Sequence, residues 1–256
     1  MLEEITPLII TWDEAPNIRR TLGKLLWARR IVVIDSGSTD GTLELLRSYP
    51  QVAVIDRQFD GFAGQCNFGL QQVRTPWVLS LDADYELSTE LLDEIAALRA
   101  DEATAGYRAR FVYRIFGRPL RASLYPPRVV LYRCNRATYV NEGHGHRVTV
   151  SGKVQSLKGA IYHDDRKPLS RWFTSQRHYA AKEADYLLSR GPKQMRGLDR
   201  IRRTGWLAPM IVFFYTLVVK RCLFDGWPGW YYVLQRVIAE SMIALEIVER
   251  RLRRNG

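Results

Sequence analysis

The chain has 256 residues, a formal net charge of +11 and 46% hydrophobic residues, which is typical of one large globular domain, alone or with an appendage. Its three cysteines, Cys66, Cys134 and Cys222, are odd in number and far apart. This spacing fits neither a disulfide framework nor a zinc site, and it favours a reducing compartment. The first ten residues carry two acids and only a short apolar run, unlike a signal peptide.

The charge is unevenly distributed along the chain. Residues 1–105 carry 9 Lys and Arg against 17 Asp and Glu, whereas residues 106–171 carry 14 against 3. Residues 196–256 carry 11 against 5. An acidic N-terminal region joined to a basic middle and tail indicates an anionic partner: a nucleic acid, an acidic membrane face or an acidic substrate. The alternative is that the arginines only cover solvated faces.

The first 105 residues alternate between strand and helix patterns. Short apolar or β-branched runs predict four strands, at 7–11, 30–36, 52–56 and 77–81. Helical spacing and capping residues predict four helices, within 12–26, 37–50, 61–73 and 88–100. This alternation predicts an α/β fold with a mostly parallel sheet and helices on both faces.

Polar side chains stand where three of these strands end. Thr11 ends the first strand, Asp35 ends the second, and Asp82 and Asp84 follow the fourth. In a parallel sheet these ends meet at one edge, where ligands bind. Two acids that are two residues apart share a face and repel each other unless a cation lies near them. A divalent metal that carries a diphosphate is one explanation, and a loop that solvates its acids is the other.

The loops at this edge also carry hydrogen-bonding groups. Glu14 and Asp35 can accept hydrogen bonds from a base ring or from ribose hydroxyls, and Ser38 lies in the small-residue stretch DSGSTDGT at 35–42. This stretch is acidic and lacks the lysine of a P-loop. The charge of a phosphate would therefore have to be met by a metal and by arginine from elsewhere.

Four segments together resemble glycosyltransferase family 2, which has the GT-A fold. They are TWDEAPNIRRTL (11–22), VVIDSGSTDGT (32–42), GQCNFGL (64–70) and WVLSLDADYEL (77–87). The similarity covers roughly residues 5–180 and is greatest to bacterial lipopolysaccharide core β-1,4-glucosyltransferases. It implies an inverting transfer of glucose from UDP-glucose, helped by Mg²⁺ or Mn²⁺, to a lipid-anchored anionic glycan such as the lipopolysaccharide inner core. A transferase that acts on polyprenyl phosphate is an alternative with the same fold.

The resemblance also implies roles by position. It assigns Thr11, Glu14 and Asp35 to the nucleoside, Asp82 to ribose or sugar, and Asp84 to the metal. Ser38, in the small-residue stretch after the second strand, is expected to bind the donor as well.

The sequence departs from the family pattern at two places. Asp13 stands where the family has Asn. In EGHGHRV (142–148), His146 takes the place of the family's His, and Arg147 stands where an acid is expected. The second departure leaves the identity of the catalytic base open.

An inverting transfer needs one base to take the proton of the acceptor hydroxyl. The acids and histidines of the basic middle are Glu142, His144, His146, His163, Asp164 and Asp165. We predict Glu142 as the base, because it lies in a histidine-rich turn of the basic region, and Asp164 as the second choice. His144 and His146 are predicted on the acceptor side. A surface loop is the alternative.

Two further stretches bear on the acceptor. Residues 106–133 alternate apolar and basic residues around a turn at 117–119, which predicts a β-hairpin with an arginine face that either lines the acceptor cleft or is solvated. In IYHDDRKPLSRW (161–172), His163 ends a predicted strand, and relatives often add such a residue to the metal site. Arg171 and Trp172 resemble the R-W motif of processive relatives, where Arg meets the diphosphate and Trp lies near the acceptor; an ordinary helix start is the alternative.

The tail carries apolar segments with basic borders. Residues 206–219 are fourteen uncharged residues, fewer than the about 18–20 that span a bilayer as a helix, and residues 233–254 have the pattern of an amphipathic helix. We expect a GT-A domain over 1–180, in which residues 1–105 bind the donor and residues 106–180 form the acceptor side, and a helical region over 181–256. This helical region is predicted to attach peripherally to the cytoplasmic face of the bacterial inner membrane, to form a homo-oligomer, or both.

Two other functions fit the sequence less well. A nucleic-acid-binding protein would place basic and aromatic residues on the sheet and would have no use for acids at strand ends. The acidic N-terminal region argues against it, so no nucleic-acid partner is expected. A nucleotidyltransferase would usually carry a glycine-rich loop with a lysine near the first strand, and residues 11–20 have neither.

Overall fold

The computed structural model describes residues 1–99, 101–121, 125–142, 145–191, 195 and 197–255. The chain divides into two compact units. Unit 1 comprises Met1–Gly117 and Ser123–Arg166, and unit 2 comprises Arg118–Ala122 and Lys167–Gly256. The predicted boundary at residue 180 falls inside one continuous helix, so residues 167–180 belong to unit 2 rather than to the sheet domain.

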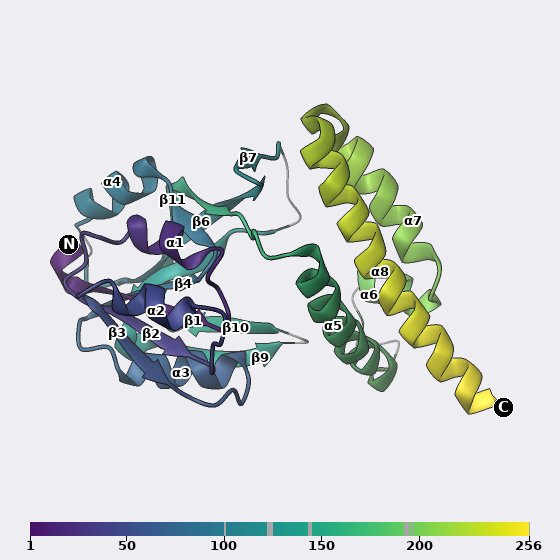
Figure 1. The fold of residues 1–256 in the computed structure, drawn as a ribbon, viewed down its shortest axis with the longest axis horizontal. Coiled ribbons are helices and arrows are strands. Elements are labelled where there is room, and N and C mark those ends of the chain that lie inside the picture. Colours follow the sequence, from purple (N-terminus) through teal and green to yellow (C-terminus); the bar gives the residue numbers. More distant parts are fainter. Residues whose placement is uncertain (100, 122–124, 143–144, 192–194, 196, 256) are drawn as a thin grey trace. The chain divides into compact units, whose positions relative to one another are not determined.

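Unit 1 begins with the alternation that the sequence predicts (Figure 1). Its strands are β1 (Ile5–Thr11), β2 (Ile31–Asp35), β3 (Val52–Asp56), β4 (Trp77–Asp82), β5 (Tyr85–Leu87), β6 (Thr104–Ile115), β8 (Arg128–Arg133), β9 (Ala137–Glu142), β10 (Gly145–Val150) and β11 (Lys153–His163). Its α-helices are α1 (Ile18–Gly23), α2 (Thr42–Arg47), α3 (Phe62–Gln71) and α4 (Thr89–Ala97), with 3-10 turns η1 (Leu2–Glu4) and η2 (Cys134–Arg136).

The main sheet is mixed and mostly parallel. Its strand order is β3-β2-β1-β4-β8-β6-β11-β5, with β3, β2, β1 and β4 parallel to one another. Strand β8 runs antiparallel between β4 and β6, β11 is parallel to β6, and β5 is antiparallel to β11. Strands β9 and β10 form a separate antiparallel pair. The predicted fold class is confirmed.

The predicted antiparallel pairing within 106–133 is present. Strand β8 pairs with the first half of β6, from Gly106 with Tyr132 to Ala109 with Arg128. Along β6, Arg108 and Arg110 are exposed and alternate with buried residues. The exposed arginines that the alternation predicts are therefore present on that strand.

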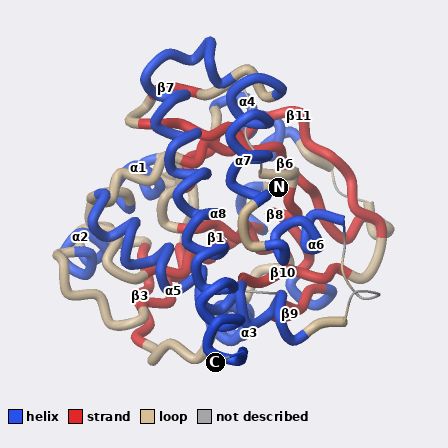
Figure 2. Tube along the Cα trace, turned by 90° about the vertical axis from the view of Figure 1, so that its right-hand side faces the viewer, coloured by secondary structure: helices blue, strands red, loops and turns tan. Residues whose placement is uncertain are grey.

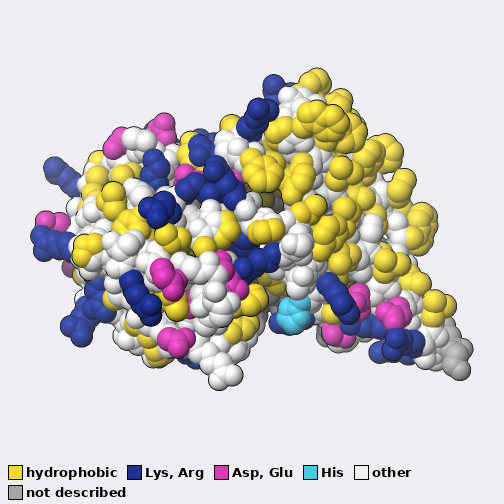
Figure 3. All heavy atoms as spheres, viewed as in Figure 1, with side chains coloured by type: hydrophobic (Ala, Val, Ile, Leu, Met, Phe, Trp, Pro, Cys, Tyr) yellow, Lys and Arg dark blue, Asp and Glu magenta, His cyan; other side chains and the backbone are white. Residues whose placement is uncertain are grey.

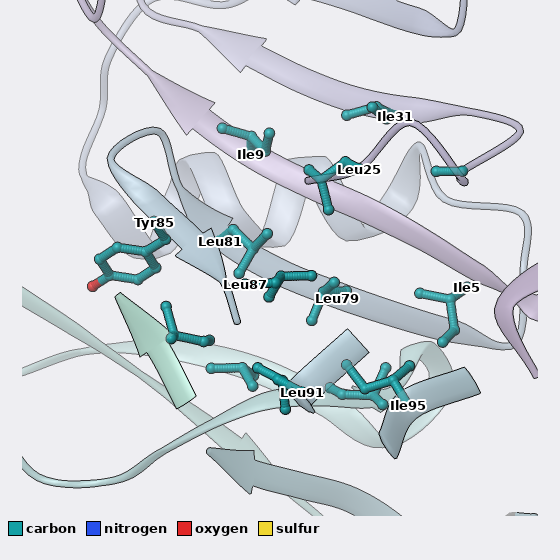
Figure 4. Packing of buried hydrophobic residues seen from close by; sticks show 14 of the residues in the cluster. Ile5, Ile9, Leu25, Ile31, Leu79, Leu81, Tyr85, Leu87, Leu91 and Ile95 are labelled. Carbon is teal, nitrogen blue, oxygen red and sulfur yellow. The ribbon is translucent and has the colours of Figure 1, made fainter. Parts of the chain in front are cut away.

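Hydrophobic side chains pack against both faces of the sheet. These side chains form two hydrophobic clusters, one on each face. In strand β1, Ile5 and Ile9 lie in the first cluster and Leu8 lies in the second, because successive residues of a strand point to opposite faces. The first cluster includes residues of α1, α2 and α4, and the second includes residues of α3. Figure 4 shows side chains of the sheet and of α4, Leu91 and Ile95 among them, directed into the first cluster.

Gly159 of β11 allows α4 to pack closely on the sheet. A Cβ atom at this position would lie 2.4 Å from Cα of Leu91, a contact that real side chains do not make. Leu91 is fully buried, and its amide donates to the capping hydroxyl of Ser88, so it has little room to move.

We therefore expect Gly159→Ala to lower the free energy of unfolding by about 1–3 kcal/mol, the usual cost of overpacking. Chemical denaturation of the purified variant measures the change. Gly23→Ala is the matched control, because a Cβ at Gly23 meets nothing within 4 Å. Equal stability of the two variants would contradict the close packing of α4 on β11.

Unit 2 is mainly helical. Its elements are β7 (Arg118–Pro119), α5 (Leu169–Ser189), α6 (Gly197–Thr204), α7 (Leu207–Phe214), a π-helix η4 (Tyr215–Val219), a 3-10 helix η5 (Cys222–Asp225) and α8 (Gly226–Asn255). Ala184 and Leu187 of α5 pack against Ile247 of α8. Arg202 of α6 donates to Glu240 of α8, which is 1% exposed, and thereby balances a buried charge.

Candidate functional site

Three strands of unit 1 end side by side at one edge of the sheet. The register pairs Thr11 of β1 with Asp35 of β2, and Ile10 of β1 with Asp82 of β4. Because these strands are parallel, their carboxyl ends lie at the same edge, where α/β sheets bind ligands. The polar residues at the three strand ends are therefore neighbours, as the alternation of strands and helices predicts.

Asp35 organises the turn that follows β2. Its side chain is 1% exposed and accepts hydrogen bonds from the amide of Ser38 at 2.8 Å and from the hydroxyl of Ser38 at 2.6 Å. It also accepts one from the amide of Gly37, whose φ of +84° suits glycine. Asp35 and Ser38 thus hold the shape of this loop, and their contact with a nucleoside stays a prediction.

Asp13 joins the loops that follow β1 and β2. Its amide donates to the hydroxyl of Ser38 at 2.7 Å, and its carboxylate accepts from the amide of Thr39 at 2.6 Å. Its φ is +51°, a left-handed conformation that Asp and Asn tolerate better than most residues. Asp in place of the family's Asn therefore keeps both the backbone conformation and the acceptor oxygen.

Asn17 is a fully buried side chain whose role the sequence reasoning missed. Its Nδ2 donates to Glu14 Oε2 at 2.8 Å and to Asp165 Oδ1 at 2.9 Å. Its Oδ1 accepts from the amide of Arg166 at 2.9 Å and from Arg20 Nη2 at 3.1 Å. These bonds saturate the amide group and tie the loop after β1, with Glu14, to the loop after β11.

Asp84 and His163 form a pair beside the strand ends. Asp84 lies between β4 and β5, His163 ends β11, and Nε2 of His163 is 3.0 Å from Oδ2 of Asp84. Their side chains are 11% and 16% exposed. Burial acts to lower the pKa of His163. The charge of Asp84 and its hydrogen bond together raise the pKa by more than burial lowers it, so the pKa lies above its ordinary value. The structure thus brings together the two residues that the family resemblance assigns to a metal.

Three tyrosine rings surround this histidine, and the sequence reasoning missed them. The ring centroids of Tyr113, Tyr85 and Tyr125 lie 4.3, 5.2 and 5.9 Å from that of His163. The hydroxyls of Tyr85 and Tyr125 are 3.0 Å apart. Burial, with a smaller contribution from the charge of Asp82, raises the pKa of Tyr125 to about 12. Burial also raises the pKa of Tyr85, so Tyr85 and Tyr125 stay neutral at physiological pH, and the three rings pack around the histidine.

Asp82 shares its electrostatic environment with His146 and Arg128. Burial lowers the pKa of His146, and the positive charge of Arg128 also lowers it. The negative charge of Asp82 acts in the opposite direction but is outweighed, so the pKa lies below its ordinary value. The His146 ring stacks on Phe62 with centroids 5.5 Å apart. The guanidinium of Arg128 lies 3.9 Å from the centroid of Tyr125. Arg128, which the sequence analysis placed only within a basic stretch, thus adds a positive charge near these groups.

Among the described residues, the buried polar atoms without a hydrogen-bond partner include Oγ1 of Thr11, at the end of β1, and Nδ1 of His163. Buried polar groups in proteins are almost always paired, so such atoms require an explanation. A ligand at this edge of the sheet would satisfy both.

Asp164 is placed differently from a catalytic base. It is fully buried, and its Oδ2 accepts from Nε of Arg166 at 3.0 Å and from Nη2 of Arg166 at 2.7 Å. Its backbone oxygen accepts from Arg20. Because the side chain is fully buried and held by this guanidinium, it offers no exposed surface to an acceptor hydroxyl. This geometry favours a structural role for Asp164.

The β9-β10 hairpin carries the other predicted acceptor-side residues. Glu142 ends β9, and its backbone pairs with Gly145 of β10. The side chain of Glu142 and the residue His144 lie outside the part of the chain that the structure describes. The role of Glu142 as the base therefore stays a prediction.

Arg171 and Trp172 belong to unit 2. They lie in the first turn of α5, where both amides donate to the backbone oxygen of Pro168. The ring of Trp172 packs edge-on against Phe173, with centroids 5.1 Å apart. Both residues thus start a helix, and their contacts with a diphosphate and an acceptor stay predictions.

The Asp84–His163 pair has donors that suit a divalent cation. A carboxylate oxygen and an imidazole nitrogen are both accepted by Mn²⁺, and Mg²⁺ prefers the carboxylate. Within the described residues of the chain, no group of three or more His, Cys, Asp and Glu side chains could hold a metal ion. A cation held by this pair would have to take its remaining ligands from a bound substrate and from water.

Comparisons with known proteins agree with this architecture. The model of the family described as glycosyl transferase family 2 matches residues 7–158. An uncharacterized glycosyltransferase of Rickettsia bellii is 26% identical over 90% of this chain and 81% of its own length. The lipopolysaccharide core biosynthesis glycosyltransferase LpsC of Rhizobium meliloti is 35% identical, over 43% of each chain.

One solved structure is similar over most of the chain. The mannosyltransferase PcManGT from Pyrobaculum calidifontis, solved in complex with GDP-Man and Mn²⁺, has a TM-score of 0.54 and 14% sequence identity, and the match covers 96% of this chain and 88% of that one. At this identity the likeness shows the fold alone.

Proposed function

Since the chain belongs to glycosyl transferase family 2, whose model matches residues 7–158, we propose that it transfers a sugar from a nucleotide-diphospho-sugar to a glycan with inversion at the sugar carbon. The observation that carries the proposal is the Asp84–His163 pair, with Oδ2 and Nε2 3.0 Å apart, at the edge where β1, β2 and β4 end. The GDP-Man and Mn²⁺ bound by the archaeal mannosyltransferase support a donor of this chemical class.

The donor would occupy the edge formed by the strand ends. Thr11 and Glu14 would contact the nucleoside, and Asp82 the ribose or the sugar. Asp84 and His163 would hold Mg²⁺ or Mn²⁺, which when bound neutralises charge on the diphosphate. The exposed Arg128 side chain, close to the ring of Tyr125, would add positive charge on the same side.

The acceptor would be an anionic glycan on a lipid anchor, such as the lipopolysaccharide inner core. The similarity to LpsC, a lipopolysaccharide core biosynthesis glycosyltransferase, supports this class. The proposed donor is UDP-glucose. The exposed Arg108 and Arg110 of β6 suit phosphates or carboxylates of such an acceptor, because guanidinium groups bind both in a bidentate manner. Glu142 would take the proton of the attacking hydroxyl.

A turnover assay tests this proposal. The purified enzyme is incubated with UDP-glucose, UDP-N-acetylglucosamine or GDP-mannose and with either deacylated inner-core oligosaccharide or polyprenyl phosphate. We expect product only from UDP-glucose and the oligosaccharide, in the presence of Mn²⁺ or Mg²⁺, and none in excess chelator. If product formed only on polyprenyl phosphate, this compound and not the oligosaccharide would be the acceptor. Full activity in chelator would contradict the proposed need for a divalent metal. The absence of sugar transfer with every combination of donor and acceptor would contradict the proposed donor class.

A further inference from the structure

Unit 2 exposes large apolar side chains between α7 and the start of α8. Six of them have high exposed fractions: Phe214 56%, Val218 60%, Val219 64%, Phe224 64%, Trp206 69% and Trp227 85%. We call these six residues the apolar face. Single exposed apolar residues are common on proteins, but a contiguous group of this kind marks an interaction site.

One side of this segment is already used for packing. Ala208 and Leu217 are buried, and Thr216 is buried with its hydroxyl donating to the backbone oxygen of Val212. Helices α7 and α8 lie side by side in both Figure 1 and Figure 2. In Figure 3, hydrophobic side chains cover most of the visible surface over α7 and the first turns of α8. Among the described residues, packing within unit 2 therefore leaves each of the six side chains of the apolar face more than half exposed.

The charges of this segment complement an anionic surface. From 205 to 235 the charged residues are Lys220, Arg221 and Asp225. The carboxylate of Asp225 is 6% exposed and lies 3.3 Å from the guanidinium of Arg121, so its negative charge is balanced within unit 2. Arg221 is exposed, and Nζ of Lys220 lies 5.6 Å from the ring centroid of Tyr215. The apolar face is thus bordered by positive charge.

The geometry fits a lipid interface better than a full crossing. Among the described residues, no single helix is long and apolar enough to cross a bilayer, and the one helix pair that would qualify, Leu207–Val219 with Cys222–Arg254, is bent by 66°. Aromatic residues next to lysine and arginine are typical of segments that lie at the boundary between headgroups and acyl chains.

We propose that the apolar face, with Lys220 and Arg221, inserts into the surface of an anionic lipid bilayer. The attachment has two components. Insertion of the apolar side chains is insensitive to salt, whereas attraction of the two basic residues to anionic headgroups is weakened by salt. Attachment of this kind does not depend on which sugar or acceptor the site uses.

Vesicle flotation of the full chain tests the proposal. The vesicles consist of phosphatidylethanolamine with phosphatidylglycerol, or of phosphatidylcholine alone. We expect binding to both, stronger to the anionic vesicles, with a fraction that resists high salt. The triple variant Phe214→Ser, Val218→Ser and Trp227→Ser should reduce the partition coefficient by at least about tenfold on both vesicle types, because several apolar side chains no longer leave water.

A matched control removes exposed apolar side chains of unit 1. Leu26, Phe59 and Val140 are 60%, 47% and 42% exposed, and their triple change to Ser should bind vesicles like the wild type. Equal loss in both triple variants, or no loss in the first, would overturn the proposal. So would a wild-type chain that never floats and has twice its 29.6 kDa mass by light scattering, since a second copy would then cover the face.

A fluorescence measurement avoids the risk that a triple variant misfolds. Trp227→Phe keeps an apolar ring and should bind vesicles normally. Quenching by brominated lipids should fall in this variant and should stay at the wild-type level in Trp27→Phe, whose tryptophan lies in unit 1. Quenching that is the same in both single variants and the wild type would show that Trp227 does not enter the bilayer, and would overturn the proposal.

Discussion

Asp84→Ala is expected to abolish sugar transfer while leaving the fold intact. Asp84 is the carboxylate closest to His163, and the two supply the donors that fit a cation. Removal of groups that only support metal ligands costs about 10–100-fold, so loss of a ligand should exceed about 100-fold. The rate of transfer with saturating UDP-glucose, measured over a range of Mn²⁺ concentrations, checks this expectation.

The controls separate loss of the cation from loss of the fold. Asp93→Ala removes an exposed carboxylate of α4 and should leave the rate unchanged. Far-UV circular dichroism of Asp84→Ala should match the wild type, because the side chain lies in the loop between β4 and β5. Wild-type activity of Asp84→Ala would refute the role of Asp84. A rate that excess Mn²⁺ restores would show that the cation has other ligands.

The edge of the sheet could be predicted from the sequence because its signals are local. Apolar runs that end on Thr11, Asp35 and Asp82 indicate strands with polar ends, and the parallel order follows from the helices between them. The pairing of Asp84 with His163 follows from family resemblance, not from spacing, because 79 positions separate the two residues.

The network around Asn17 could not be predicted in this way. Its partners Asp165 and Arg166 are 148 and 149 positions away, and an asparagine after a proline is an ordinary loop residue. The tyrosine rings around His163 come from separate segments of the chain, so the same reason applies to them. Asp164 illustrates the opposite difficulty: next to His163 it resembles a site residue, but only the structure reveals that it is buried against Arg166.

The boundary at residue 180 shows a limit of pattern reasoning. The resemblance continues through residues 161–172, but α5 begins at Leu169 and runs without interruption to Ser189. The whole helix belongs to unit 2, so the division between the units falls before it. Arg171 and Trp172 therefore both resemble the R-W motif and lie in the first turn of a helix. The contacts within unit 2 reflect the start of the helix, and a role in the site stays a prediction.

Substitution of the two candidate bases should have different effects on rate and stability. Glu142→Gln keeps the shape of the side chain but removes its ability to accept a proton, so kcat should fall by about 10²–10⁴ while donor affinity and thermal stability are kept. Asp164→Asn should lower thermal stability, because the charge of Arg166 then loses its buried partner, while kcat falls less than about tenfold. Transfer rates, donor titrations and thermal melts of the two variants measure these effects. If Asp164→Asn instead lost about 10² in kcat at unchanged stability and Glu142→Gln stayed within about tenfold of the wild type, Asp164 would be the base and its pairing with Arg166 would have to open during the reaction.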